Sequence, residues 1–334
     1  MSKKTLVLVT EPIDEIGLQL LGESCDLRTP WTRGSAFNDE DLKEADAIIV
    51  RSVPVTASLI CKSPKLKVIG RHGAGLDSVD LNAATLRRIP VIYTPFVTAN
   101  AVAEHAVHLM LSLARQTLAA DEAVRKSRFD IRDSLIGFEL RDTILGIVGL
   151  GAVGMRVAEI CHKGFEMKVV AFDPFAQLPA SLDFVRRIDS LRELLQQADI
   201  VTLHTPLTSE THHLINSESL GWMKCSALLI NTARGAIIDT RELAFALNSG
   251  RLMGVALDVF EVEPLPADHP LQSAPRVLFS PHNGGATREA RKAMSELVAR
   301  QVLQVLHGER PKFLANPEVF EARSSVDQIP SLIK

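Results

Sequence analysis

Three side chains with complementary polar chemistry follow one another in the second half of the chain, each shortly after an apolar run. Arg234 follows residues 228–230, Glu263 follows residues 254–257, and His282 follows residues 277–280. An arginine can hold a carboxylate with two parallel hydrogen bonds. A histidine titrates near neutral pH and can protonate an alkoxide, and a glutamate on its other ring nitrogen would fix the tautomer. We therefore predict these three as catalytic residues for hydride transfer on a 2-oxo or 2-hydroxy acid.

A glycine motif earlier in the chain indicates what would carry the hydride. Gly149, Gly151 and Gly154 form G-x-G-x-x-G between an expected strand at residues 144–148 and an expected helix from about residue 153 to 163. The amides and dipole of such a helix favour a pyrophosphate. Asp173 ends the next expected strand, where a carboxylate accepts hydrogen bonds from ribose hydroxyls and repels a 2′-phosphate. The motif therefore predicts NAD rather than NADP.

The elements that must position these residues alternate between short aliphatic runs and helix-like segments, which is typical of parallel sheets. A first series of strands is expected at residues 6–9, 47–50, 67–69 and 91–93. A second series of six is expected at residues 143–148, 169–172, 200–203, 227–230, 254–257 and 277–280. A long buried helix is expected at residues 98–115, and a charged stretch at residues 121–133 precedes the second series.

The predicted fold is therefore α/β, with two doubly wound parallel-sheet domains. Residues 1–97 and 287–334 are expected to form a discontinuous, flavodoxin-like substrate-binding domain, and residues 98–286 a Rossmann NAD-binding domain. The discontinuity rests on an amphipathic helix that starts at Thr287 and could return to the first sheet before the chain thins into a polar tail.

Composition narrows the function classes. A chain of 334 residues with 46% hydrophobic and 5% aromatic residues has enough aliphatic core for about two domains. A net charge of -3 offers no general attraction to nucleic acid or anionic membranes. The four cysteines lack metal or disulfide spacing, and we find neither a signal peptide nor a membrane span in the sequence. We expect a cytoplasmic protein whose partner is a small molecule.

Taken together, these motifs make the chain resemble the D-2-hydroxyacid dehydrogenase family over nearly its whole length, and most of all its D-3-phosphoglycerate dehydrogenase and hydroxypyruvate reductase members. The resemblance rests on the glycine motif and on Arg51-Ser52, residues 70–80, 100–104, 231–235, 258–264 and 281–285. It implies the catalytic set already named, NAD as cofactor, and a homodimer, with a dimer of dimers as a further possibility.

The resemblance also implies the binding residues. NAD contacts are expected from Gly149, Gly151, Ala152, Val153, Gly154, Asp173, His204, Thr205, Pro206, Thr211, Thr232, Ala233, Asp258, His282 and Gly284. Substrate contacts are expected from Arg51, Ser52, Arg71, His72, Gly73, Ala74, Gly75, Asn100 and Arg234, with backbone amides of residues 73–75 binding the carboxylate.

The far end of the substrate is the open question. Arg51, Arg71 and His72 suggest a second anionic group, as in 3-phosphoglycerate, and Arg132 could reach in from a partner subunit. Two departures from the family pattern, Asn283 after the histidine and His72 at a position that is often small, bear on the substrate more than on the reaction. A hydroxypyruvate or glyoxylate reductase without phosphate preference is the alternative enzyme.

Other readings are weaker. Formate-type relatives keep a glutamine where this chain has Glu263. A non-catalytic NAD-sensing binding protein, as among transcriptional corepressors, shares the architecture, but the complete catalytic set argues against it. The histidine pairs at residues 212–213 and at 105 and 108 lack further ligands at metal spacing. The basic patch at residues 125–128 is short enough to be a solvated turn, so we expect neither a metal nor a nucleic-acid partner.

Overall fold

The structure, a computed structural model, describes residues 4–320 and divides them into two compact units. Unit 1 contains the chain up to Thr98 and again from Thr287, and unit 2 spans Ala99–Ala286. The expected first boundary, between residues 97 and 98, differs from this division by one residue, and the second coincides with it. The expected polar tail beyond residue 320 lies outside the described residues.

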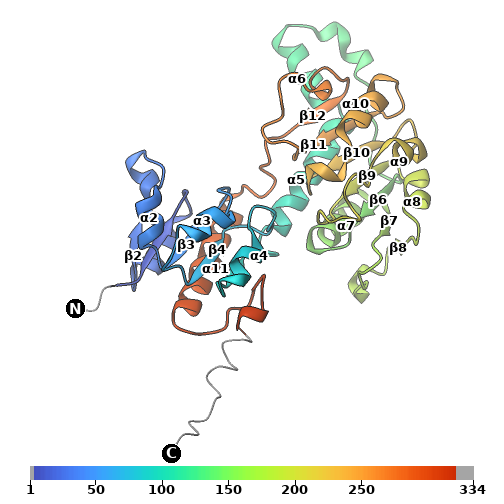
Figure 1. The fold of residues 1–334 in the computed structure, drawn as a ribbon. Helices are drawn as coiled ribbons and strands as arrows, with labels where there is room; N and C mark the ends of the chain where they lie inside the picture. The colour runs from blue at the N-terminus through green and yellow to red at the C-terminus, as the bar shows by residue number, and fades with distance from the viewer. Residues whose placement is uncertain (1–3, 321–334) are drawn as a thin grey trace, which may run out of the picture. The chain divides into compact units, whose positions relative to one another are not determined.

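Unit 1 is built on a parallel sheet of five strands in the order β2-β1-β3-β4-β5 (Figure 1). This is the flavodoxin-like order. Its strands are β1 (Leu6–Val9), β2 (Asp26–Arg28), β3 (Ala47–Val50), β4 (Val68–Arg71) and β5 (Val91–Tyr93). Its helices are α1 (Glu15–Gly22), α2 (Asp39–Glu44), α3 (Ala57–Cys61), α4 (Leu81–Leu86) and α11 (Arg288–Leu306). Side chains alternate between the two faces, so that Ile48 packs with α2, α3 and α4 while Ile49 packs with α1 and α11.

The last helix closes unit 1, as the sequence predicts. Thr287 caps α11 by accepting a hydrogen bond from the backbone N of Ala290. Val298 and Val302 of α11 then pack on β4 so closely that a Cβ at Gly70 would lie 3.0 Å from each of them. The segment after residue 287 is therefore part of the first sheet's core, although it follows unit 2 in the chain.

Unit 2 contains a parallel sheet of seven strands in the order β12-β11-β10-β9-β6-β7-β8, which is the Rossmann order extended by one strand. Its strands are β6 (Ile144–Val148), β7 (Lys168–Phe172), β8 (Val185–Arg187), β9 (Ile200–Leu203), β10 (Leu228–Asn231), β11 (Gly254–Leu257) and β12 (Val277–Phe279). The helices α5 (Ala99–Ala114) and α7 (Ala152–Phe165) pack on one face. The helices α8 (Leu191–Gln197), α9 (Ser217–Trp222) and α10 (Thr240–Asn248) pack on the other.

The α/β class with two parallel sheets is thus confirmed, and the differences lie at edges. Strands β2 and β8 were not predicted, because these three-residue edge strands lack a buried apolar run: β2 has one exposed and two half-buried residues, and two of the three residues of β8 are exposed. Residues 121–133 were predicted only as a charged stretch. Helix α6 (Thr117–Arg125) enters that stretch, and its charges form the i,i+4 pairs Arg125–Asp121 and Lys126–Glu122.

Candidate active site

The predicted residues of unit 2 gather at one edge of its sheet, because the carboxyl ends of parallel strands share an edge. Gly149 follows β6, Asp173 follows β7, and His204 follows β9. The turns that carry the three predicted catalytic residues follow β10, β11 and β12, which are neighbours in the sheet (Figure 1). The boundary between the two sets, β9 beside β6, is the switch point at which open α/β sheets bind ligands.

The glycine turn has the shape that a dinucleotide phosphate requires. Gly149 has a φ of 95°, and a Cβ at Gly154 would lie 2.1 Å from the carbonyl oxygen of Gly149. Gly151 is the N-cap of α7 and makes no side-chain cap, and a Cβ there would meet nothing within 4 Å. The first amides of α7 have no acceptor within the helix and lie at the positive end of its dipole, next to this open position.

Asp173 is tied to this turn. Its Oδ2 accepts a hydrogen bond from the backbone N of Leu150 at 2.8 Å, inside the glycine motif, and its Oδ1 accepts from the backbone N of Phe175 and of Ala176. Burial alone would raise the pKa of Asp173, but these three bonds and the nearby Arg187 outweigh burial and lower it. The carboxylate is thus ionised at neutral pH beside the place where a ribose would follow the pyrophosphate.

Two further predicted NAD contacts carry polar atoms that lack partners. The hydroxyls of Thr205 and Thr232 are buried and make no hydrogen bond among residues 4–320. Buried hydroxyls are rarely left unpaired, so each needs a partner that the protein itself does not supply. Together with the first amides of α7, they fit a dinucleotide. The ring of His204 bonds instead to Thr202, and burial lowers the pKa of His204 to about 3, which keeps the imidazole neutral.

The predicted acid–base pair is formed. The Nδ1 of His282 lies 2.7 Å from Oε2 of Glu263, and the other carboxylate oxygen accepts a hydrogen bond from the backbone N of Phe260. The side chains of His282 and Glu263 are 54% and 39% exposed, so that Nε2 remains the ring nitrogen available to a substrate. His282 has a φ of 52°, a left-handed conformation that is costly for a residue with a side chain and recurs at functional sites.

Asp258 holds the turn that carries His282. Its carbonyl accepts a hydrogen bond from the backbone N of His282, and its carboxylate accepts from the backbone N of Asn283 at 3.0 Å and of Gly284 at 2.9 Å. The side chain is 2% exposed. Burial would raise the pKa of Asp258, but hydrogen bonds, first among them one from His105, lower it. The predicted contact of Asp258 with NAD stays a prediction, whereas its structural role in this turn is direct.

Arg234 lies in a turn fixed by its own neighbours. The side-chain amide of Asn231 donates to the carbonyl of Arg234, and the Nη1 of Arg234 donates to the carbonyl of Ala233. The predicted NAD contact Thr211 likewise closes its own loop, because its hydroxyl donates to the carbonyl of Pro206.

The predicted substrate residues of unit 1 cluster around the loop after β4. The Nη1 of Arg71 donates to the carbonyl of His72 at 2.7 Å, and a Cβ at Gly73 would lie 2.6 Å from that same nitrogen. The ring of His72 is 2% exposed, and its Nε2 bonds to the hydroxyl of Ser295 in α11. The His72 side chain therefore lies in the core, while Ala74 is exposed on the loop.

The Arg51–Ser52 segment is held by a residue that the sequence analysis missed. The carboxylate of Glu11 accepts hydrogen bonds from the backbone N of Arg51, Ser52 and Val53 and from the hydroxyl of Ser52. No local motif connects Glu11 to a loop forty residues later. In unit 2, Asn100 is engaged with its neighbours, since it donates to Glu104 and accepts from Arg156 of α7.

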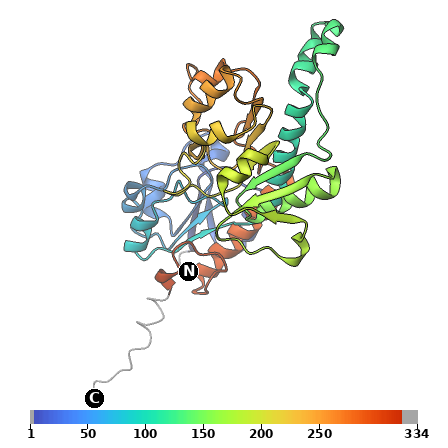
Figure 2. The same ribbon diagram turned by 90° about the vertical axis from the view of Figure 1, so that its right-hand side faces the viewer.

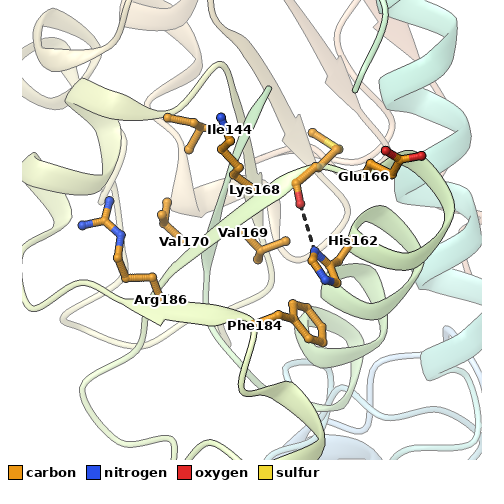
Figure 3. A pocket seen from close by; sticks show the side chains of 9 residues that line it. Ile144, His162, Glu166, Lys168, Val169, Val170, Phe184 and Arg186 are labelled. Carbon is orange, nitrogen blue, oxygen red and sulfur yellow. Dashed lines mark hydrogen bonds between the residues drawn. The ribbon is translucent and has the colours of Figure 1, made fainter. Parts of the chain in front are cut away.

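Other features of unit 2 lie apart from this edge. A pocket of about 480 Å³ is lined in part by His162, Phe184, Lys168 and Arg186. Figure 3 shows these side chains. The pocket adjoins Ile144 and Lys168, the first residues of β6 and β7, so it lies at the opposite strand ends from the glycine turn. In the part of the chain that the structure describes, no three His, Cys, Asp or Glu side chains are placed to hold a metal. None of the helices within residues 4–320 is long and apolar enough to cross a membrane.

Comparison with known proteins places this site in a family context. Residues 107–284 match the family model described as D-isomer specific 2-hydroxyacid dehydrogenase, NAD binding domain. A glyoxylate reductase of Thermofilum pendens is 39% identical over 97% of this chain and 98% of its own length. A D-3-phosphoglycerate dehydrogenase of Methanocaldococcus jannaschii is 38% identical over 93% of this chain, which spans only 59% of that relative.

A solved structure of a 2-hydroxy acid dehydrogenase also has a similar fold. The crystal structure of a D-lactate dehydrogenase from Aquifex aeolicus, complexed with NAD and lactic acid, matches with a TM-score of 0.80 and 28% identity, covering 91% of this chain and 96% of that one. That structure and the family model each associate the fold with NAD.

Proposed function

Because the chain belongs to the D-isomer specific 2-hydroxyacid dehydrogenase family, we propose that its substrate is a small 2-hydroxy or 2-oxo acid with a second anionic group, with 3-phosphoglycerate and phosphohydroxypyruvate as the first candidates. The reaction class follows from the family, whose members are NAD-dependent oxidoreductases. NAD, when bound, supplies or accepts the hydride, and Gly151, Asp173, Thr205 and Thr232 would hold it.

In the proposed mechanism, the chain's own residues bind the acid and move the proton. Arg234 binds the α-carboxylate and helps to polarise the adjacent carbonyl. His282 donates a proton from Nε2 to the oxygen that becomes the hydroxyl, and in the oxidative direction it accepts that proton. Glu263 keeps Nδ1 paired and stabilises the protonated ring, at a separation of 2.7 Å. Since the imidazole is half exposed, water can restore its proton.

The observation that carries the second anionic group is the pair of guanidinium groups near residue 72. Burial, together with the positive charges of Arg51 and Arg71, lowers the pKa of His72 to about 4, and the Nη1 of Arg71 donates to the carbonyl of His72, so both cations lie close to this residue. A substrate with one carboxylate needs one cationic group for it, the role proposed for Arg234. Two additional arginines are useful when a phosphate, sulfonate or second carboxylate must be neutralised.

A second candidate, hydroxypyruvate or glyoxylate reductase, is favoured by the relatives. Several that are 35–39% identical over nearly the whole of this chain are named glyoxylate reductase, among them that of Thermofilum pendens.

The test is NADH oxidation with phosphohydroxypyruvate, hydroxypyruvate, glyoxylate and sulfopyruvate. Loss of a charged hydrogen bond in Arg71→Met should raise KM for the doubly anionic substrates about 10- to 100-fold and leave glyoxylate nearly unchanged. Arg33→Met, an exposed arginine of unit 1 with no ion pair in the described chain, is the control. An equal loss with every substrate would exclude the anion role, and a preference for glyoxylate in the wild type would favour the second candidate.

The catalytic assignment has its own test. We expect His282→Ala to reduce turnover by orders of magnitude while NADH binding, followed by fluorescence titration, stays close to that of the wild type. Loss of NADH binding in this variant would assign His282 a structural role instead.

The proposal includes a homodimer, with a dimer of dimers as the larger alternative. Four large apolar side chains are exposed on α6 and the segment after it: Leu118, Val124, Phe129 and Ile136. In Figure 2 this part of the chain extends away from the sheet of unit 2. Large apolar side chains exposed along one segment are typical of a protein interface, and Arg132, whose side chain is 83% exposed, lies on the same segment. Light scattering should show that Phe129→Glu dissociates the dimer and that Phe245→Glu, on α10, does not.

A cytoplasmic location is also part of the proposal. Cys25, Cys61, Cys161 and Cys225 are free thiols, and burial raises the pKa of Cys161 to about 12, so it stays protonated. Free thiols persist in reducing compartments. Cell fractionation of the tagged protein would test this point.

A further inference from the structure

His213 connects the two segments that carry Arg234 and Glu263. Its backbone N donates a hydrogen bond to the carbonyl of Ala236 at 2.8 Å, within the 3-10 turn Gly235–Ile237 that directly follows Arg234. Its ring Nε2 lies 2.7 Å from Oε1 of Glu261, in the loop between β11 and Glu263. One residue therefore touches both the predicted carboxylate-binding turn and the predicted acid–base loop.

Glu261 is anchored on its other side as well. Its Oε2 accepts hydrogen bonds from the backbone N of Thr240, at 3.2 Å, and from the hydroxyl of the same residue, which begins α10. A carboxylate at a helix N-terminus is favoured by the helix dipole. Burial alone would raise the pKa of Glu261, but hydrogen bonds from Thr240 and His213 lower it, so the group is a carboxylate.

The turn and the loop meet backbone to backbone. A Cβ at Gly235 would lie 1.8 Å from the carbonyl carbon of Phe260, so no side chain fits between them. The backbone N of Phe260 in turn donates to the Oε1 of Glu263, whose Oε2 faces His282. A shift of the loop at Glu261 would therefore turn the Glu263 carboxylate relative to both Arg234 and His282.

The backbone conformation of His213 is one that its neighbours must hold in place. Its φ is 48°, a left-handed conformation that is unfavourable for a residue with a Cβ unless its surroundings hold it. The surroundings do so through Ala236, through Glu261 and through Asn216, whose side-chain amide donates to the carbonyl of His213.

We propose that the His213–Glu261 pair positions the Glu263 loop against the Arg234 turn and is thus a positioning pair for hydride transfer. The inference rests on the proposed roles of Arg234 and Glu263. It assigns no contact with substrate or NAD to His213.

The test separates turnover from binding. A loop displaced by about 1 Å loses about 10- to 100-fold in rate, so His213→Ala should lower kcat by that factor. NADH affinity and the KM for the oxo acid should stay close to those of the wild type. His213→Gln, which can still donate to Glu261, should recover most of kcat. His212→Ala is the matched control, because its ring stacks on His213 at 4.0 Å but makes no hydrogen bond within the described residues.

The outcomes are distinguishable. Normal kcat in His213→Ala, or a loss that His213→Gln does not recover although both variants stay folded by thermal melting, would overturn the inference. A loss of NADH affinity, or a rise in the KM for the oxo acid, as large as the fall in kcat would also overturn it. Normal kcat in Glu263→Gln would instead remove the proposed catalytic role on which the inference rests, whatever His213→Ala does.

Discussion

Replacing Asp258 tests how strongly the turn that carries His282 depends on one buried carboxylate. In Asp258→Ala, the backbone N–H groups of Asn283 and Gly284 lose acceptors that lie at 3.0 and 2.9 Å. The backbone carbonyl at position 258, which accepts from His282, remains. The variant therefore removes two backbone hydrogen bonds from one side of the turn, together with the carboxylate's contact with His105, and leaves the other side intact.

The expected magnitude follows from burial. An unpaired buried N–H costs about 1–3 kcal/mol, so two would cost at most about 6 kcal/mol. Asn283 is exposed and its N–H can turn to water, whereas Gly284 is buried. We therefore expect a loss of about 2–4 kcal/mol in the free energy of unfolding. For a unit of this size that corresponds to a fall of about 4–16 °C in Tm.

The assay is thermal unfolding of the wild type and three variants by circular dichroism. Asp258→Asn keeps one acceptor and should fall between the wild type and Asp258→Ala. Asp268→Ala, which removes an exposed carboxylate with no hydrogen bond in the described chain, should melt with the wild type. If Asp258→Ala melted within a degree or so of this control, the turn would not depend on the carboxylate and the reasoning would be refuted.

Acid pH offers an independent check on the same group. The folded-state pKa of Asp258 is lowered, so its ionisation stabilises the fold above the unfolded-state value of about 3.9. That contribution is lost as the pH falls through the folded-state pKa. The difference in stability between the wild type and Asp258→Asn should accordingly be present at neutral pH and shrink below about pH 4.

Three further changes test other parts of the site. Glu263→Gln keeps a hydrogen-bond partner for His282 but removes a charge that is 39% exposed, so we expect a barrier higher by about 1–2 kcal/mol, or a kcat lower by about 5- to 30-fold, in steady-state assays. Burial lowers the pKa of His72 to about 4, so the unfolded chain binds a proton near pH 6.5 that the fold rejects. In urea unfolding, the free energy of unfolding of the wild type should therefore fall by about 2 kcal/mol from pH 7 to pH 5 because of this residue. His72→Gln should not show this loss. Gly154→Ala would place a Cβ 2.1 Å from the carbonyl oxygen of Gly149, so NADH binding should weaken about 10-fold or more by fluorescence titration, and an unchanged affinity would remove the glycine turn from the cofactor site.

The sequence predicted those features of the site that depend on strand ends. Arg234, Glu263 and His282 could be placed at one edge because each follows a buried aliphatic run, and parallel strands align their carboxyl ends. The contact between Glu263 and His282 followed from their chemistry. The glycine motif was informative for the same reason, since its meaning depends on the strand before it and the helix after it.

The remaining features depend on contacts that have no local pattern. The sequence predicts His72 as a substrate contact near two arginines, but its ring bonds to Ser295, more than two hundred positions later. His213 and Glu261 are far apart in the sequence, and the 3-10 turn Gly235–Ile237, which bonds to His213 and packs on Phe260, brings them together. The edge strand β8 was missed because two of its three side chains are exposed. In each case the feature depends on the tertiary structure, and the hydrophobic periodicity of the sequence does not predict it.

One kind of contact explains how the exposed residues proposed as catalytic keep their geometry. Carboxylates that transfer no proton in the proposed mechanism accept hydrogen bonds from the backbone near the strand ends. Asp173 holds the glycine turn, Asp258 holds the turn of His282, and Glu261 holds the loop of Glu263 to α10. In all three, burial opposes ionisation and hydrogen bonds outweigh it, so the pKa is lowered. Since a carboxylate accepts from two or more amides at once, one side chain can fix a whole turn, and the acid–base pair can face solvent without losing its alignment.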